Sequence, residues 1–201
     1  MEPDDWDRRY EQTDFLWTAE PNRFLVREVE ALAPGRALDL AAGEGRNAVW
    51  LAGRGWRVVA VDFSRVALGK ARELAQARGV ELDLELADAR TYRPTYHGFD
   101  LVLVMYLHLP WAEMAPVLRR AAGAVAPGGT FLLVGHDRDN LERGHGGPPD
   151  AKVLYSAADV VREIGVDGLV IEKAGQEERP VATEEGTPVA IDCLVRARRA
   201  D

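Results

Sequence analysis

The sequence predicts an α/β fold in which helices cover both faces of a doubly wound, mostly parallel sheet of about seven strands. Short β-rich runs alternate with Ala-, Leu- and Arg-rich segments of helical period. The first five runs are almost continuously apolar, as expected of strands that are buried on both faces. The last two runs have no helical segment between them, which favours an antiparallel C-terminal hairpin.

The seven predicted strands are short runs rich in Val, Leu, Ile and Phe, bounded by turn-forming residues. A polar stretch over residues 175–188 separates the last two strands. The strands are expected over residues 36–41, 57–61, 82–86, 99–105, 130–135, 169–174 and 189–197.

Helical segments are expected between the strands. Ser64 is placed to cap one helix, Gly79 to end it, and Pro127-Gly128-Gly129 predicts a sharp break after the next one. Ser156 and Asp159 resemble a capping box, with Asp in place of Glu, for a further helix that ends near residue 164. The first three helices are expected over residues 46–54, 64–78 and 112–126.

The segment before the first strand contains Trp6, Tyr10 and Trp17, followed by an amphipathic stretch over residues 22–32. We interpret residues 1–34 as a helical lid beside a core over residues 35–201, all in one domain. The alternative is that these aromatic residues only cover the sheet, because aromatic residues at helical spacing are usually core.

Composition and charge predict a cytoplasmic protein with a small-molecule partner. A net charge of −8 and a pI near 5.1 disfavour nucleic acid, whose phosphates attract basic surfaces. Cys193 has no second cysteine to pair with, and the acidic N-terminus differs from a signal peptide. No apolar run approaches the roughly 20 residues that cross a bilayer, so no membrane association is expected. A monomer or homodimer is expected.

A glycine-containing turn between the first strand and the first helix is the most informative segment. Gly43 and Gly45 let the backbone approach a ligand at the carboxyl edge of the sheet, where doubly wound folds bind their ligands. The same turn, read from Gly43 to Ala48, satisfies the dinucleotide fingerprint, and Asp62 stands where such a fold places its ribose-binding acid. An NAD(P)-linked oxidoreductase is therefore one alternative.

Acidic residues follow or precede the ends of three successive strands. Asp39 precedes the glycine turn, Asp62 ends the second predicted strand, and Asp88 follows the third. Together with residues 99–106 and 118–132, this pattern resembles the class I S-adenosylmethionine-dependent methyltransferase family, which has a Rossmann-like sheet. The turn and a Gly-Gly-Pro-Pro loop over residues 146–149 look most like the tellurite-resistance and thiopurine methyltransferase-like group.

The resemblance implies S-adenosylmethionine as the cofactor and assigns contacts to it. Asp62 would hold the ribose hydroxyls, which agrees with the ability of a carboxylate to accept two hydrogen bonds from a vicinal diol. Phe63 would pack on the adenine and Met105 would flank the adenosyl group, with a core position as the alternative for both. From the lid interpretation, Tyr10 or Arg23 would close over the methionine end. The residues expected to bind the cofactor are Asp39, Ala41, Gly43, Gly45, Asp62, Phe63, Ser64, Asp88, Ala89, Met105 and Tyr10.

Purely structural roles are the alternatives for the three acids. Asp62 would cap the helix that begins near Ser64. Asp88 would be a turn residue, because Asp is common after strands. Asp39 would only form hydrogen bonds in the first turn, whereas its ligand contact, if present, would include one through water.

Two histidines are candidates for a substrate-side base. His108 follows the fourth predicted strand and His136 follows the fifth, and both are therefore expected at the carboxyl edge. For each, the alternative is a hydrogen-bonded loop histidine, because methyl transfer from a sulfonium does not require a base. His145 lies in a long loop that would cover the substrate pocket, and His97 is expected at the surface.

Several methyltransferase subclasses and a metal site are disfavoured. The turn over residues 105–110 lacks the Asn/Asp-Pro-Pro-Tyr sequence of enzymes that methylate amino groups of DNA bases. One cysteine excludes the thiol chemistry of cytosine-carbon and arsenite-type enzymes. The run over residues 137–140 is similar to an Mg²⁺-binding Asp-Asn pair, but Met105 replaces the companion acid, so no metal is expected.

A non-catalytic adenosyl-ligand-binding protein is the third functional alternative.

Overall fold

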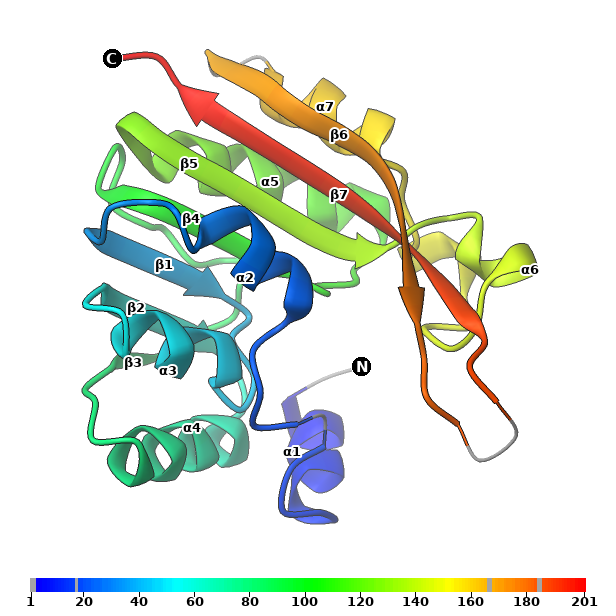
Figure 1. The fold of residues 1–201 in the computed structure, drawn as a ribbon, viewed down its shortest axis with the longest axis horizontal. Coiled ribbons are helices and arrows are strands. Elements are labelled where there is room, and N and C mark those ends of the chain that lie inside the picture. Colours follow the sequence, from blue (N-terminus) through cyan, green and yellow to red (C-terminus); the bar gives the residue numbers. More distant parts are fainter. Residues whose placement is uncertain (1–2, 17, 166–167, 184–185) are drawn as a thin grey trace. The chain divides into compact units, whose positions relative to one another are not determined.

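The computed structural model describes residues 3–16, 18–165, 168–183 and 186–201. Seven strands form one sheet in the order β3-β2-β1-β4-β5-β7-β6 (Figure 1). β1, β2 and β3 pair in parallel, whereas β7 pairs antiparallel with both β5 and β6. The predicted α/β fold, mostly parallel with an antiparallel C-terminal pair, is confirmed.

The chain divides into two compact units, residues 1–93 with 99–103, and residues 94–98 with 104–201. The prediction of one domain stays a prediction.

The first unit contains three parallel strands and the helices that connect them. Its strands are β1 (Arg36–Leu40), β2 (Arg57–Asp62) and β3 (Asp83–Leu86), followed by the first residues of β4 (Phe99–Met105). Its helices are α1 (Pro3–Glu11), α2 (Arg23–Val29), α3 (Arg46–Ala52) and α4 (Arg65–Ala77). β1 and β2 are buried nearly throughout, which explains why both sequences read as apolar runs.

Two helices at the N-terminus lie in this unit. Asn22 caps α2 by accepting a hydrogen bond from the backbone N–H of Phe24, so the predicted amphipathic stretch begins at a defined cap. α1 contacts α4, and Tyr10 is the buried residue of α1. The expected helices are therefore present before β1. Trp17, predicted to belong to this segment, lies outside the described residues.

The second unit contains the rest of β4 and the C-terminal strands. Its strands are β5 (Val125–His136), β6 (Leu169–Pro180) and β7 (Val189–Arg199). α5 (Trp111–Ala124) and α7 (Ala157–Ile164) are its longer helices, and the short α6 (Asn140–Arg143) and η1 (Ala151–Val153) follow β5. The predicted capping box is confirmed: the Ser156 side chain and the Asp159 side chain each accept the other residue's backbone N–H.

The helix before Pro127-Gly128-Gly129 ends as predicted, since α5 stops at Ala124, but these residues belong to β5, which begins at Val125 and not at residue 130. A contact from the far end of the chain explains the difference. The buried guanidinium of Arg199 donates to the backbone carbonyls of Val125 and Ala122, at 2.7 and 2.9 Å, and so satisfies the end of α5 as the strand begins.

β6 is also longer than predicted. It runs through the polar stretch to Pro180, and its residues alternate between exposed and half-buried. Its register against β7 continues to the pair Pro180 and Val189. Partner hydrogen bonds and one partly covered face are enough to make a polar sequence a strand at the sheet edge.

Candidate functional site

The glycine turn after β1 is tied directly to the acid at the end of β2. Leu40 pairs with Val61, so the two strands end side by side. The backbone N–H of Gly43 donates to Asp62 Oδ2 at 2.8 Å, and the N–H of Ser64 donates to Asp62 Oδ1 at 2.9 Å. Burial raises the pKa of Asp62, although these N–H donors oppose the shift. The first unit therefore brings two predicted ligand residues together.

The backbone of this turn is left-handed at three positions. Ala41 has φ 63°, Gly43 has φ 56° and Gly45 has φ 77°. A Cβ on Gly45 would lie 2.6 Å from the Cβ of Ala71, so glycine is required there by packing as well as by conformation. Left-handed non-glycine residues such as Ala41 cost energy and cluster at ligand sites, which agrees with its predicted contact.

Asp39 lies behind the turn and is fully buried. Neither of its carboxylate oxygens has a hydrogen bond of good geometry among the described residues, although the backbone N–H of Ala48 acts on this carboxylate and lowers its pKa. Burial, reinforced by the nearby Asp62 carboxylate, raises the pKa of Asp39 to about 7, although Arg46 acts in the opposite direction. A buried carboxylate with so few donors is costly, which is why its proton is held more tightly.

Asp88 and Ala89 follow β3, whose last residue, Leu86, pairs with Asp62. The Asp88 carboxylate accepts hydrogen bonds from the backbone N–H and the Nε of Arg90, both at 2.8 Å. Burial would raise the pKa of Asp88, but its contacts with Arg90 outweigh that effect and lower it. Asp88 is therefore a turn residue in this structure, on the same strand edge as Asp62 and still partly exposed.

Ser64 and Tyr10 attach helices around the turn. The Ser64 hydroxyl accepts the N–H of Ala67 at 3.0 Å and donates to Asp7 of α1, so it caps α4 as predicted. A Cβ on Gly43 would lie 3.1 Å from the Tyr10 hydroxyl, which places that ring against the turn. Phe63, which precedes Ser64 in the chain, is half-buried.

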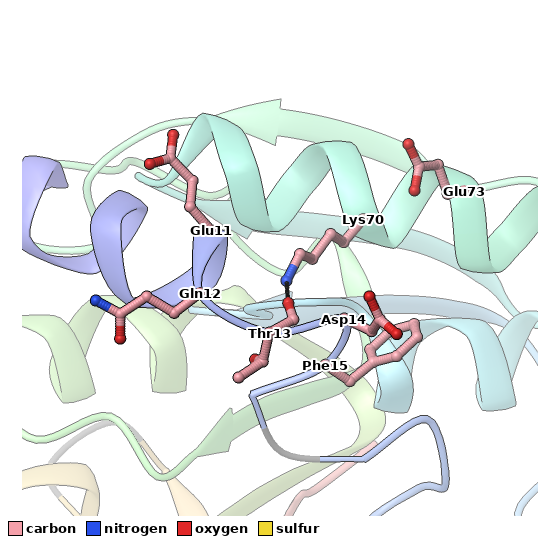
Figure 2. A pocket seen from close by; sticks show the side chains of 7 residues that line it. All are labelled: Glu11, Gln12, Thr13, Asp14, Phe15, Lys70 and Glu73. Atoms are coloured by element: carbon pink, nitrogen blue, oxygen red, sulfur yellow. Dashed lines mark hydrogen bonds between the residues drawn. The ribbon is translucent and has the colours of Figure 1, made fainter.

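Glu44 and Lys70 fix the segment after α1, and sequence reasoning missed both. The buried Glu44 carboxylate accepts the Leu16 N–H at 2.9 and 3.0 Å and lies 3.1 Å from Lys70 Nζ. Lys70 also donates to the backbone carbonyls of Tyr10 and Thr13, and Figure 2 shows it extending from α4 toward Thr13. The position of Glu44 inside the glycine turn was the available sequence signal.

An open depression of about 570 Å³ lies on this part of the first unit. None of the predicted ligand residues lines it, and Lys70, its one cation, is already bonded to backbone carbonyls. Figure 2 shows its lining residues, which are Glu11, Gln12, Thr13, Asp14, Phe15, Lys70 and Glu73.

His108 and His136 meet in the second unit, with ring centroids 5.4 Å apart. Both nitrogens of His108 are engaged: Nδ1 lies 3.2 Å from the Val153 carbonyl, and Nε2 accepts the backbone N–H of His136 at 3.4 Å. Burial, followed by the neighbouring His136, lowers the pKa of His108 to about 4. This geometry favours the structural alternative for His108.

His136 instead faces a buried acid on β7. Its Nδ1 lies 3.2 Å from Asp192 Oδ1. The other oxygen of Asp192 accepts the Tyr106 hydroxyl at 2.8 Å and Arg179 Nε at 2.7 Å. Burial would raise the pKa of Asp192, but its contacts with His136, Arg179 and Tyr106 outweigh that effect and lower it. Sequence reasoning missed Asp192 because it lies inside an apolar strand.

The remaining predicted residues of this unit are packed or peripheral. Met105 is buried at the end of β4. His145 is exposed, but a Cβ on its near neighbour Gly147 would lie 2.9 Å from the His136 ring, so the predicted loop does reach this cluster. His97, expected at the surface, is half-buried because Tyr96 stacks on it with ring centroids 4.0 Å apart.

The acidic run after β5 is held by several side-chain hydrogen bonds. Asp137 accepts a hydrogen bond from Gln176 Nε2 at 2.9 Å. Asn140 Oδ1 accepts the backbone N–H of Ile191 at 2.7 Å, and Asn140 Nδ2 donates to the Gly146 carbonyl at 2.8 Å. In the described ranges, no group of three His, Cys, Asp or Glu side chains is arranged to hold a metal ion. No helix of the described residues is long and apolar enough to cross a membrane.

Residues 37–129, which include the glycine turn and the three acids, match the family model described as a methyltransferase domain. This segment is a class I methyltransferase domain. The methyltransferase domain is similar to demethylmenaquinone methyltransferase of Thermus thermophilus, with 36% identity over 51% of this chain and 47% of the relative. A tRNA 5-carboxymethoxyuridine methyltransferase of Escherichia coli is 27% identical over 70% of this chain and 59% of the relative. The chain spans about half the length of the first curated relatives it matches.

Solved structures support the fold of the whole chain. A protein from a study titled "Conversion of a Disulfide Bond into a Thioacetal Group during Echinomycin Biosynthesis" superposes with TM-score 0.74 and 22% identity, over 98% of this chain and 92% of its own. TehB of Haemophilus influenzae superposes with TM-score 0.72 and 15% identity, over 98% of this chain and 66% of its own. At these identities the likeness concerns the fold.

Proposed function

We propose that the chain is an enzyme that transfers a methyl group from S-adenosylmethionine to a small-molecule nucleophile. The observation that carries the proposal is the contact between the Gly43 N–H and the Asp62 carboxylate. It fixes an acid with spare acceptor lone pairs beside a turn that has no Cβ at Gly43 or Gly45. The buried carboxylate of Asp39 lies in the same unit, and we expect it to support the turn from the strand beneath it.

These residues fit the proposed methyl donor. Asp62 would accept hydrogen bonds from the ribose hydroxyls, and charge-assisted bonds of this kind are the stronger ones. S-adenosylmethionine supplies an activated methyl group, so the protein has to hold the acceptor in line and exclude water. Tyr10, fixed against Gly43, is placed to cover the turn. The methyltransferase family match favours this chemistry over the NAD(P)-linked alternative.

Calorimetry with S-adenosylmethionine, S-adenosylhomocysteine and NADH tests the proposal. We expect the two adenosyl ligands to bind and NADH not to bind. Asp62→Ala should weaken S-adenosylmethionine binding by about 100-fold, since it removes two charge-assisted hydrogen bonds. Asp83→Ala is the matched control, because Asp83 is an exposed acid at the opposite end of the neighbouring strand β3. Equal binding by the parent and Asp62→Ala would refute the ribose assignment.

The acceptor is proposed to be a small molecule, although relatives that methylate tRNA are also similar to this chain. The net charge of −8 supports this choice, because it opposes binding to phosphates. Methyl transfer from labelled donor to total tRNA, compared with a panel of thiols, phenols and amines, separates the two. A cytoplasmic location and a monomeric or dimeric state belong to the same proposal.

A further inference from the structure

Glu44 lies between the two glycines of the glycine turn, and its side chain is bonded to the N-terminal segment. Its carboxylate accepts the backbone N–H of Leu16 at 2.9 and 3.0 Å and lies 3.1 Å from Lys70 Nζ. Lys70, on α4, donates in turn to the backbone carbonyls of Tyr10 and Thr13. We call Glu44 and Lys70 the latch. One ion pair therefore joins the turn, α4 and the segment after α1.

Tyr10 is the residue that these attachments hold against the turn. A Cβ on Gly43 would lie 3.1 Å from the Tyr10 hydroxyl, so the tip of the ring lies on the side that the glycine leaves open. Before Tyr10 in the chain, the Asp7 carboxylate accepts the Ser64 hydroxyl and, at 3.4 Å, the backbone N–H of Val66. After Tyr10, the latch holds the segment. Tyr10, which is 5% exposed, is therefore fixed from both sides along the chain.

Besides the latch, the segment after α1 has an apolar attachment at Phe15, which packs against a small buried cluster on α3 and α4. Residues 12–14 are exposed, and an open depression of about 570 Å³ lies along this stretch. Figure 2 shows that its lining comes from this stretch and from α4. α1 has nine residues, which is too few for a stable isolated helix. The position of the segment therefore depends strongly on the latch.

We propose that Glu44 is a positioning residue: through Lys70 it holds Tyr10 over the glycine turn, so that bound S-adenosylmethionine leaves only when the latch opens. This inference rests on the proposed function, to which it adds control of the residence time of the methyl donor. A ligand under a fastened cover dissociates at the rate at which the cover opens. A nearly buried ion pair that also bonds to the backbone opens less often than an exposed segment without such contacts.

The two members of the latch belong to elements that pack closely on each other. A Cβ on Gly45 would lie 2.6 Å from the Cβ of Ala71, the residue after Lys70. The side chains of Glu44 and Lys70 are 3% and 16% exposed, so salt screens their attraction less than that of a surface pair. Opening requires the segment after α1 to leave, while both charges stay on the turn and α4. The latch can therefore open without disturbing the turn.

Amide hydrogen exchange tests the latch without a ligand. The Leu16 N–H donates to Glu44, so its exchange should be slow in the parent and about 10-fold faster in Lys70→Met. Lys70→Arg keeps the charge and should retain most of the protection. Glu73→Gln is the matched control, because Glu73 is an exposed acid on α4 that lines the same depression. Equal exchange of Leu16 in the parent and Lys70→Met overturns the inference.

Release of labelled S-adenosylmethionine, chased by rapid mixing with excess S-adenosylhomocysteine, tests the control of residence time. Glu44→Gln and Lys70→Met should release the donor about 10-fold faster, with the association rate changed by less than about threefold. Glu73→Gln should match the parent. Glu44→Gln keeps the shape of the side chain, so the measurement stands even where Lys70→Met does not fold.

A core variant separates the latch from a general loss of stability. Val58→Ala leaves a cavity at a buried position of β2, so it should lower the free energy of unfolding without faster release of the donor. If Val58→Ala accelerates release as much as Glu44→Gln does, the inference is overturned.

A double variant shows whether the latch acts through Tyr10. Tyr10→Ala should accelerate release of the donor, and the addition of Glu44→Gln should produce no further acceleration. Additive effects of the two substitutions on the release rate overturn the inference.

Calorimetry separates this inference from the proposed function. If the parent binds neither S-adenosylmethionine nor S-adenosylhomocysteine, the proposed function fails and the inference fails with it. If the parent binds the donor but Glu44→Gln and Lys70→Met release it at the parent's rate, the inference alone is overturned. Faster release by both variants at a nearly unchanged association rate supports both.

Discussion

The ammonium of Lys70 lies 3.1 Å from the carboxylate of Glu44, and the two side chains are 16% and 3% exposed. Glu44 belongs to the glycine turn and Lys70 to α4, and both also bond to the backbone of the segment that follows α1, at Leu16 and Thr13. The N-terminal segment is therefore fastened to the turn by a nearly buried ion pair.

Lys70→Met should destabilise the protein by roughly 3 kcal/mol, because removal of one partner leaves a buried charge without its counter-ion. Chemical denaturation measures the loss, and calorimetry should show weaker S-adenosylmethionine binding as the segment loosens. Lys152→Met is the control, since Lys152 is exposed and its side chain forms no ion pair among the described residues. Equal stability of the two variants would contradict the proposed role of the pair.

Gly45→Ala should destabilise the protein by about 3 kcal/mol, through a left-handed backbone and a methyl group forced against Ala71. Gly69→Ala provides a matched comparison in α4, because a Cβ there meets nothing within 4 Å and glycine is unfavourable inside a helix. The free energy of unfolding of Gly69→Ala should be higher than that of the parent by about 0.5 to 1 kcal/mol. Urea titrations measure the free energy of unfolding of both variants. An unchanged free energy of unfolding for Gly45→Ala would show that the turn accepts a Cβ at this position.

The raised pKa of Asp39 predicts a specific pH dependence of stability. Its folded-state value of about 7 lies above the ordinary value of 3.8, so the folded protein binds the proton more tightly than the unfolded chain. The contribution to stability is full below pH 4 and is lost as the pH rises through 7. Asp39→Asn should remove this loss, so its stability relative to the parent should increase between pH 5 and pH 8. A constant difference across that range would contradict the assignment.

Asn140→Ala should cost about 2 kcal/mol, because it leaves the buried Ile191 N–H and the Gly146 carbonyl without their partner. Hydrogen exchange of the backbone amides of residues 144–147 should accelerate as the loop loses its attachment. Arg143→Ala removes only an exposed ion pair with Asp139 and should change stability by less than about 0.5 kcal/mol. Unchanged exchange in Asn140→Ala would show that other contacts hold the loop.

Local sequence signals predicted most of the fold. The strand-like runs placed all seven strands, and the Ser64 cap and the Ser156–Asp159 box gave the starts of two helices. The expectation that the first five strands are buried on both faces is wrong for β3, which is mostly exposed because it lies at the sheet edge. These signals work because burial on both faces and capping depend on residues close together in the chain. The glycine turn and Asp62 were found for the same reason, since strand ends and left-handed turns have their own residue preferences.

The predictions that were wrong or incomplete concern residues whose partners are distant in the sequence. The extra length of β5 and β6 follows from Arg199 and from pairing with β7, and no local pattern contains either contact. His108 and His136 looked equivalent in the sequence, and only the packing of Val153 and Asp192 against them separated their roles.

The sequence by itself determined the order of strands and helices, the glycine turn and the acids at the strand ends, because periodicity and turn chemistry are local properties. Tertiary structure decided which polar side chains are buried and with whom, as in Glu44 with Lys70 and Asp192 with His136. The physical reason is that the cost of burying a charge is set by its partners in space, and those partners are brought together only by folding.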